Sequence, residues 1–427
     1  MSSLRQYDRD RGLSERLGQR ALRLPEDAEL MDWVHAQLCS DGSPSVTKAE
    51  LVFARWKPGT ALLGSWRMDF SDGQQRFINW KRYLGPKASA KGAAFRLDAH
   101  MLGASAPLKA FALLPGSDGI LTCFPADRRL TGAARVLDLR RTGRLLDASG
   151  IWGESVLRRQ SSSMQLLRYK PEHRAVLRFH AKLKQDREGP RISAGERFFG
   201  VRVLAPENAK RVIANRAQGP KGLFPELLWH EPENGILLEE WVPGTPLEWN
   251  AFERAEQAAG LLRQLHQPCQ ATKPRQHSRE GALELLDLLP GAAKLIHQVP
   301  SLDTSHCSHW IHADFHPDQL IEGESGLRLL DADALRPGTP EEDFASWIAD
   351  QLQAQPEQMF AALLEPLMAG HDSSPANLDV DLVRALSTEQ LIHRAAAGLR
   401  RLELGAESQA LGLLERAARL AEERIPR

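Results

Sequence analysis

The feature that most constrains the fold is a change of hydrophobic pattern near residue 204. Before this point, apolar and polar residues alternate over residues 49–84 and 164–204, and turn dipeptides such as Pro58-Gly59 and Asp72-Gly73 separate the alternating runs. After it, apolar residues recur at helical spacing. Strands gathered in one part of a chain and helices in the other predict a two-lobed α+β protein.

Six stretches after residue 204 carry an apolar stripe with a polar opposite face, which predicts helices. They are residues 207–217, 251–266, 280–297, 341–369, 378–403 and 406–424. Two short apolar runs between them, 235–242 and 326–333, are typical of strands. Near the N-terminus, residues 27–39 predict a short amphipathic helix with Asp27 as a candidate cap.

These patterns divide the 427 residues into three parts, which agrees with a typical domain size of ~150 residues. Residues 1–150 form an N-terminal extension with hairpins, residues 151–242 a small antiparallel sheet lobe, and residues 243–427 a helical lobe. Within the extension, residues 86–107 predict a loop, and residues 120–130 predict a strand that runs into a turn.

A four-residue echo links the two alternating stretches. Arg55-Trp56-Lys57-Pro58 and Arg168-Tyr169-Lys170-Pro171 lie 113 residues apart, and each precedes a strand, a polar turn and a second strand. Two interpretations stay open. One is an imperfect duplication, and the other is a pair of unrelated hairpins with similar turns.

Composition excludes several classes of protein. The 55 Lys and Arg balance the 55 Asp and Glu, so there is no overall basic field to hold nucleic acid. The cysteines, Cys39, Cys123, Cys269 and Cys307, are far apart and form no C-x-x-C pair, which fits a reducing compartment. The charged N-terminus has no apolar core typical of a secretory signal, and no apolar run approaches the ~18 residues of a membrane span. We expect a cytoplasmic protein that contacts neither membrane nor nucleic acid.

The most informative stretch is residues 310–350, WIHADFHPDQLIEGESGLRLLDADALRPGTPEEDFASWIAD. It places Asp314 on a loop and Asp331, with Asp333 close behind, after an apolar strand. Two acids so placed can divide two tasks. One accepts a proton from a substrate hydroxyl, and the other holds a divalent cation on a nucleotide triphosphate.

This stretch resembles the aminoglycoside phosphotransferase and choline kinase-like branch of the protein-kinase-like fold. The family signature has an H-x-D-x-H-x-x-N loop, a strand that ends in I-D-x-D/E, and a G-D-P-x-x-D-L-A-like stretch. The corresponding blocks here are His312-Ala-Asp314-Phe-His316-Pro-Asp-Gln319, Leu330-Asp331-Ala-Asp333 and Gly338-Thr-Pro340-Glu-Glu-Asp343-Phe-Ala345. Upstream, GILLEEWVPGTPLE (235–248) is similar to the family's lobe-connecting strand, and LLRQLHQ (261–267) to its x-x-L-H helix end.

The resemblance implies a role for each matching residue. Asp314 would be the catalytic base, Asp331 the main metal ligand, and Gln319 would occupy the metal-binding Asn position. Asp333 is open between a second metal ligand and a turn residue. The backbone of the connecting segment would face the adenine of ATP, between the two lobes. This segment contains Glu239, Glu240, Trp241 and Val242.

The remaining residues of the motif have supporting roles in this interpretation. His312 and His316 are expected to brace the loop by hydrogen bonds. Asp343 is expected to be a helix-cap or lobe-bracing acid.

Two departures from the family pattern concern the phosphate and metal positions. Gln319 replaces Asn, which keeps the carbonyl oxygen and adds a methylene. Arg202 stands where the family usually has its phosphate-binding Lys, and helix 207–217 offers only Glu207 as an acidic partner. On this strand, alternation puts Arg202 on the face opposite Val201, and we expect the Val201 face to be the core.

The resemblance thus implies an ATP- and magnesium-dependent phosphotransferase that acts on a hydroxyl of a small molecule. A sugar, an amino alcohol and an aminoglycoside-like compound are all open as the acceptor. The alternative is a nucleotide-binding regulatory protein without turnover, in which residues 1–150 are a partner-binding module.

Overall fold

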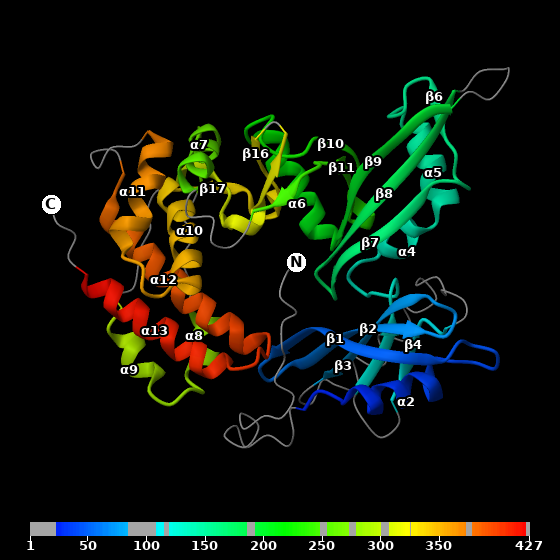
Figure 1. Ribbon diagram of the computed structural model, residues 1–427, viewed down its shortest axis with the longest axis horizontal. Coiled ribbons are helices and arrows are strands. Elements are labelled where there is room, and N and C mark those ends of the chain that lie inside the picture. The colour runs from blue at the N-terminus through cyan, green and yellow to red at the C-terminus, as the bar shows by residue number, and fades with distance from the viewer. Residues whose placement is uncertain are drawn as a thin grey trace. The chain divides into compact units, whose positions relative to one another are not determined.

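The computed structural model in Figure 1 describes the chain in nine segments. These are residues 23–83, 108–114, 119–185, 193–247, 254–272, 279–299, 307–324, 326–372 and 378–423. The expected loop at 86–107 lies outside them. The chain divides into two compact units. Unit 1 contains residues 1–211, 226–241 and 401–404, and unit 2 contains residues 212–225, 242–400 and 405–427.

The described part of unit 1 starts with a helix and an antiparallel sheet of five strands in the order β1-β2-β3-β5-β4. The elements are α2 (Asp27–Gln37), β1 (Val46–Lys57), β2 (Ala61–Phe70), β3 (Gln75–Tyr83), β4 (Phe111–Leu113) and β5 (Gly119–Cys123). The strands expected over 49–84 and at the start of 120–130 are therefore confirmed. Asp27 is not a cap: it is the first helical residue, and its carboxylate accepts the indole N–H of Trp66 at 2.9 Å.

A second antiparallel sheet follows in unit 1, with the order β10-β11-β9-β8-β6 and with β7 also paired to β8. Its elements are α4 (Gly132–Leu137), α5 (Leu139–Ala148), β6 (Ser155–Leu157), β7 (Ser163–Lys170), β8 (Arg174–Gln185), β9 (Ser193–Leu204), α6 (Pro206–Gln218), β10 (Leu227–Glu231) and β11 (Ile236–Glu240). Helix α6 begins in unit 1 and continues into unit 2.

Alternation along β9 decides which face of the second sheet is buried. Phe199, Val201 and Val203 belong to the hydrophobic core, where Val136 of α4 and Leu146 of α5 also lie. The expected core face is thus confirmed, and Arg202 lies on the opposite face. The whole arrangement follows the α+β class expected from the sequence.

The two sheets of unit 1 repeat one another. Read from their first long strands, they run β1-β2-β3-β5-β4 and β7-β8-β9-β11-β10. The first hairpins share their register, because Trp56 pairs with Leu62 and Tyr169 pairs with Ala175. A helix precedes each set of strands, α2 in the first case and α5 in the second. The two sheets therefore share their strand order and the register of their first hairpins, and the duplication suggested by the four-residue echo stays a prediction.

This repeat makes positions of β3 and β9 equivalent. Lys81 of β3 pairs with Leu63 of β2, and Arg202 of β9 pairs with Val176 of β8. Since Leu63 and Val176 occupy the same place in their hairpins, Lys81 and Arg202 are equivalent residues.

A buried carboxylate, Asp127, joins the two halves of unit 1. Its Oδ2 accepts the hydroxyl of Tyr169 and the backbone N–H of Glu172, both at 2.8 Å. Its Oδ1 accepts the N–H groups of Arg129 and Leu130. Burial raises the pKa of Asp127 and, together with the charge of Asp127, raises that of Tyr169 well above its ordinary value. Tyr169 is therefore the proton donor of the pair.

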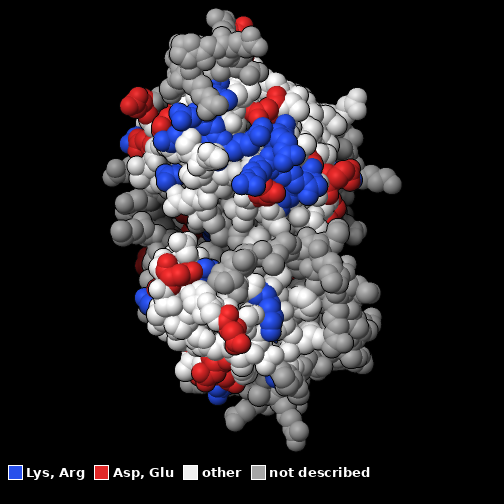
Figure 2. Space-filling model, turned by 90° about the vertical axis from the view of Figure 1, so that its right-hand side faces the viewer, with Lys and Arg blue, Asp and Glu red and all other residues white. Residues whose placement is uncertain are grey.

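Charge is unevenly distributed over unit 1, although the chain as a whole is neutral. Figure 2 shows a cluster of Lys and Arg side chains on the face that includes the side of α5. Helix α5 contributes three exposed arginines, Arg140, Arg141 and Arg144.

Unit 2 consists mainly of helices with two small sheets. Its elements after β11 are β12 (Thr245–Pro246), α7 (Ala255–Leu265), β13 (Pro268–Thr272), α8 (Glu280–Leu286), α9 (Ala292–His297), β14 (Cys307–Ile311), β15 (Leu320–Gly323), β16 (Gly326–Leu329), β17 (Arg336–Gly338), α10 (Pro340–Ala354), α11 (Phe360–His371), α12 (Val380–Arg400) and α13 (Ala406–Glu422). The sheets are β12-β15-β16 and β13-β14-β17. Among the described residues, no helix is both long and apolar enough to cross a membrane.

We predict that Asp127→Ala destabilises the protein by about 2–4 kcal/mol, because four donors lose a buried acceptor. Asp138→Ala is the matched control. That carboxylate also accepts two backbone N–H groups, but at the exposed start of α5, where a lost cap costs ~1 kcal/mol. Urea denaturation of both variants measures the difference. Equal losses would contradict the joining role of Asp127.

Candidate active site

The expected catalytic residue, Asp314, lies on the loop that follows β14. Its side chain is 59% exposed. The preceding residue, Ala313, has a left-handed backbone conformation with a φ of 63°. A non-glycine residue in this region is strained, and the strain persists only where the surroundings hold it. Other parts of the unit must therefore fix this loop.

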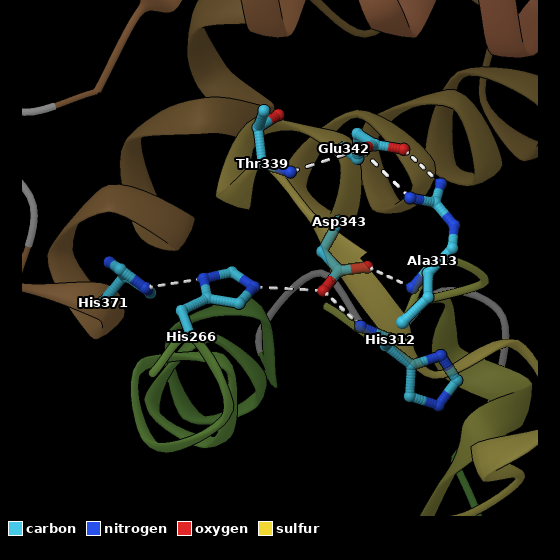
Figure 3. A network of polar contacts seen from close by, with 8 residues as sticks. His266, His312, Ala313, Thr339, Glu342, Asp343 and His371 are labelled. Atoms are coloured by element: carbon cyan, nitrogen blue, oxygen red, sulfur yellow. Dashed lines mark hydrogen bonds and ion pairs between the residues drawn. The ribbon is translucent and has the colours of Figure 1, made fainter. Parts of the chain in front are cut away.

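Asp343 of α10 holds the loop, as Figure 3 shows. Its Oδ2 accepts the backbone N–H of His312 at 2.8 Å, and its Oδ1 accepts the N–H of Ala313 at 2.7 Å. Its side chain is fully buried. Since both oxygens bind consecutive peptide groups, the position of α10 sets the direction in which Asp314 leaves the loop.

Of the two roles expected for Asp343, the structure assigns the bracing one. The cap of α10 is Thr339, which forms a capping box with Glu342. Asp343 lies one residue further along the helix and binds the loop instead.

A second side chain supports Asp343 from behind. His266, which follows the end of α7, places Nε2 3.0 Å from Asp343 Oδ2, and its Nδ1 lies 2.9 Å from Nε2 of His371. Burial alone would raise the pKa of Asp343, but the hydrogen bond and charge of His266, with those of His312, hold it below its ordinary value. Asp343 is thus a carboxylate at neutral pH. Sequence reasoning noted the L-H helix end but gave His266 no role, and no sequence signal indicated His371.

Leu330 connects the loop to the expected metal residues through its backbone. Its N–H donates to the carbonyl of Gln319 at 2.8 Å, and its carbonyl accepts Nε2–H of His312 at 2.9 Å. The hairpin of β15 and β16 sets this register, because Leu320 pairs with Leu329. Asp331 follows Leu330 directly, so it is one residue away from the backbone contact with Gln319. The expected bracing role of His312 is confirmed.

The atoms around Gln319 fit a hard divalent cation. The amide nitrogen of Gln319 lies 3.1 Å from His316 Nε2, which leaves the amide oxygen as the atom available to a metal. Asp331 is half-buried and has a left-handed conformation with a φ of 55°. The described chain contains no cluster of three or more His, Cys, Asp or Glu side chains that would hold a metal by itself. Two oxygens suit magnesium, which takes its other ligands from phosphate and water.

His316 lies between the expected base and the expected metal ligand. Besides its contact with Gln319, its Nε2 is 3.8 Å from Asp314 Oδ1. At this separation the two side chains form no hydrogen bond, so the bracing contact of His316 is the one with Gln319. Asp333 belongs to a short 3-10 turn, Ala332–Ala334, and is half-buried, so its two interpretations stay open.

The Arg202 position has an acidic partner that the sequence analysis missed. Arg202 donates to both carboxylate oxygens of Glu239 on β11, from Nε at 2.6 Å and from Nη2 at 2.8 Å. Both residues are 7% exposed. Helix 207–217 supplies no partner for Arg202, as the sequence indicated, because its one acid, Glu207, pairs with Arg129 at the surface. The partner comes from the neighbouring strand, because Gly200 and Leu237 place the two side chains diagonally on one face.

Part of the connecting segment already forms backbone hydrogen bonds within the second sheet. Glu239 pairs with Gly200, and the N–H of Glu240 donates to the carbonyl of Glu226 at 2.9 Å. Strand β11 ends at Glu240, so Trp241 and Val242 follow it as the link to unit 2. The adenine contact assigned to these four residues stays a prediction.

The expected site residues therefore form two groups. Asp314, Gln319, Asp331 and Asp333 belong to unit 2, where one loop and one hairpin position them. Arg202, Glu239, Glu240 and Trp241 belong to unit 1, whereas Val242, the next residue, belongs to unit 2.

Comparisons with known proteins give structural matches only. No family model and no curated protein matches the chain. It is similar in structure to choline kinase from Cryptosporidium parvum, with 12% identity and a TM-score of 0.41 over 65% of this chain and 95% of that one. It is also similar to a choline/ethanolamine kinase family protein from Mesorhizobium loti, with 15% identity and a TM-score of 0.41 over 60% of this chain and 88% of that one. A third similar structure is aminoglycoside 2'-phosphotransferase-IIIa, with 14% identity and a TM-score of 0.40 over 60% of this chain and 92% of that one. The function proposed for the chain therefore rests on the residues of the site.

The pKa of His371 yields a prediction for stability. Burial, followed by the charge of His266, lowers this pKa from 6.5 to about 4. Between these values the unfolded chain binds a proton that the folded protein does not, so stability falls as the pH decreases from about 6.5 to about 4. His371→Gln should reduce this slope, by less than the ~1.4 kcal/mol per pH unit of one full proton because the ring is partly exposed.

Urea denaturation at a series of pH values checks this expectation. His297→Gln, at an exposed position of α9, should leave the slope unchanged. A wild-type slope in the His371 variant would show that another group dominates the window.

Proposed function

We propose that the protein is a phosphotransferase that uses ATP and magnesium to phosphorylate a hydroxyl of a small molecule. The observation that carries this proposal is the placement of Asp314. An exposed carboxylate projects from a strained loop whose two preceding N–H groups are held by a fully buried acid. Such rigid support for an exposed carboxylate is what a base that must meet a substrate hydroxyl requires.

The chain's own residues would share the work as follows. Asp314 orients the acceptor hydroxyl and takes its proton, while the peptide held by Asp343 keeps the loop of Asp314 in place. Asp331 and the amide oxygen of Gln319 would hold magnesium. A bound magnesium ion would supply charge neutralisation for the phosphate oxygens.

The acceptor stays open between a sugar, an amino alcohol and an aminoglycoside-like compound. An acceptor with a basic amine carries a positive charge, so it needs carboxylates near the bound hydroxyl. A neutral sugar does not. Activity measured with matched pairs of acceptors, with and without an amine, separates these classes directly.

A second candidate function is nucleotide binding without turnover. One observation favours it: the guanidinium of Arg202 is already neutralised by a buried, two-point contact with Glu239. Breaking a buried ion pair by removing one partner is costly, so this contact competes with any phosphate for the same donors.

We predict that Asp314→Asn lowers kcat by roughly a hundredfold to ten-thousandfold while nucleotide affinity is retained, because the amide cannot accept the proton. Magnesium-dependent ATP turnover, measured with a panel of sugars and amino alcohols, tests this. Asp318→Asn, at an exposed position of the same loop, is the matched control and should behave as wild type. Nucleotide binding with no turnover for any acceptor would favour the second candidate.

We further predict that Arg202→Ala weakens nucleotide affinity by roughly tenfold to a hundredfold, the value of one or two charged hydrogen bonds. Glu239→Gln should not weaken it, since the variant removes the competing charge and keeps the side-chain shape. Calorimetry measures both affinities, and thermal unfolding confirms that each variant is folded. Arg197→Ala, at an exposed position of the same strand, is the control. If Arg202→Ala binds nucleotide as wild type does, Arg202 serves the structure alone.

A further inference from the structure

Unit 1 contains a pocket that the proposed function does not use. It consists of two adjoining hollows that share the lining residues Leu63, Lys81, Pro171 and Glu172. One wall is the first sheet, and the other is the turn between β7 and β8, to which Pro171 and Glu172 belong. The pocket therefore lies where the two halves of the repeat meet.

Basic side chains from neighbouring strands line this pocket. The ladders place Arg55, Leu63 and Lys81 in one row across β1, β2 and β3, with Lys57 two positions beyond Arg55 on the same face. Burial, followed by the charge of Arg55, lowers the pKa of Lys57, as expected for a cation crowded by others. The row is thus a concentration of positive charge in a hollow.

Two acidic residues also line the pocket, and they differ in their availability. Both oxygens of Asp127 are taken up by hydrogen bonds, as described above. Glu172 forms an ion pair with Lys81 from the tip of its turn, where its φ is 58°. Glu172 is therefore the one acid in the described lining that an incoming anion would have to displace.

The pocket also contains a buried acceptor without a partner. Asn79 lines the pocket and is 4% exposed. Its amide nitrogen donates to Thr122 Oγ1 at 3.1 Å and to the hydroxyl of Tyr169 at 2.9 Å. Its Oδ1 has no hydrogen-bond partner among the described residues. Since buried polar atoms are normally paired, this oxygen indicates a missing donor.

The two sheets differ in where the equivalent cations, Lys81 and Arg202, find their acidic partners. In the second sheet, the equivalent cation, Arg202, has its acid within the sheet, at Glu239. In the first sheet, the residue at the place of Glu239 is Thr122, because Asn79 pairs with Thr122 as Gly200 pairs with Glu239. Lys81 consequently takes its carboxylate from a turn outside the sheet, where a ligand can replace it.

We propose that this pocket binds a small phosphate ester that carries a free hydroxyl, with the phosphate on Lys57 and Lys81 and the hydroxyl donating to Asn79 Oδ1. A phosphate dianion matches several basic side chains that converge from neighbouring strands. A hydroxyl supplies the donor that Asn79 lacks. The site is separate from the nucleotide chemistry, so it holds or fails independently of the proposed function.

Calorimetry on the full chain, in a buffer free of phosphate and at low ionic strength, tests the site. The probes are glycerol 3-phosphate, inorganic phosphate, glycerol and L-malate. We expect saturable binding of glycerol 3-phosphate, weaker binding of inorganic phosphate, and none of glycerol. Equal affinity for the two phosphates would overturn the contact with Asn79. Malate bound as tightly as glycerol 3-phosphate would overturn the choice of phosphate.

Four variants locate the binding. Lys57→Met and Lys81→Met should each weaken glycerol 3-phosphate by about tenfold, the loss of one charged hydrogen bond. Glu172→Gln should tighten it, because the competing carboxylate is gone, and a merely structural residue would not produce a gain. Lys48→Met, at an exposed position of β1 outside the pocket, should bind as wild type does.

The result that overturns the proposal is specific. Either no probe binds saturably, or Lys57→Met and Glu172→Gln both keep wild-type affinity. Within the described residues, the hydrogen bonds of Lys57 come from its backbone and its side chain forms none and no ion pair, so its variant is expected to fold even if Lys81→Met does not.

Discussion

The candidate active site depends on one buried carboxylate. Asp343 accepts two consecutive backbone N–H groups and faces His266, so the strained peptide before Asp314 has a single arrangement in which its donors are satisfied. Removing a buried acceptor leaves every donor unpaired, which costs more than the bonds themselves contribute. The same solution appears in unit 1, where Asp127 accepts four donors from two segments. In both places an acid that sequence alone would assign to the surface organises the backbone around it.

Much of the fold could be predicted from the sequence because its signals are periodic. Alternation identified β1 to β3 and β7 to β9, and helical spacing identified α6, α7, α12 and α13, since burial on one face is a local property of the pattern. The predicted stretches 280–297 and 341–369 each contain two helices, α8 with α9 and α10 with α11. Alternation also gave the orientation of Arg202. The cap of α2 was predicted wrongly, because Asp27 binds the indole of Trp66, a residue that only the folded sheet brings near.

The site was predictable in part, for a related reason. Asp314, Gln319 and Asp331 occur in a spaced motif, and their grouping follows from a short hairpin close in sequence. The partner of Arg202 could not be found in this way, because Glu239 is reached across a strand register rather than along a helix. His371 contributes to the network from a distant helix, and no spacing rule connects it to His266. Long-range pairing, rather than residue type, sets the limit of prediction here.

Because the two sheets of unit 1 are alike, each strand must pair in its own sheet rather than in the other one during folding. Two sheets with the same strand order and the same hairpin register offer each strand two places to pair, and repeated modules characteristically misassemble by such exchange. The Arg202–Glu239 pair discriminates between them. If β9 took the place of β3, Arg202 would lie beside Thr122, and its two-point contact with Glu239 would be lost. The ion pair thus favours the pairing of β9 in its own sheet over pairing in the first sheet.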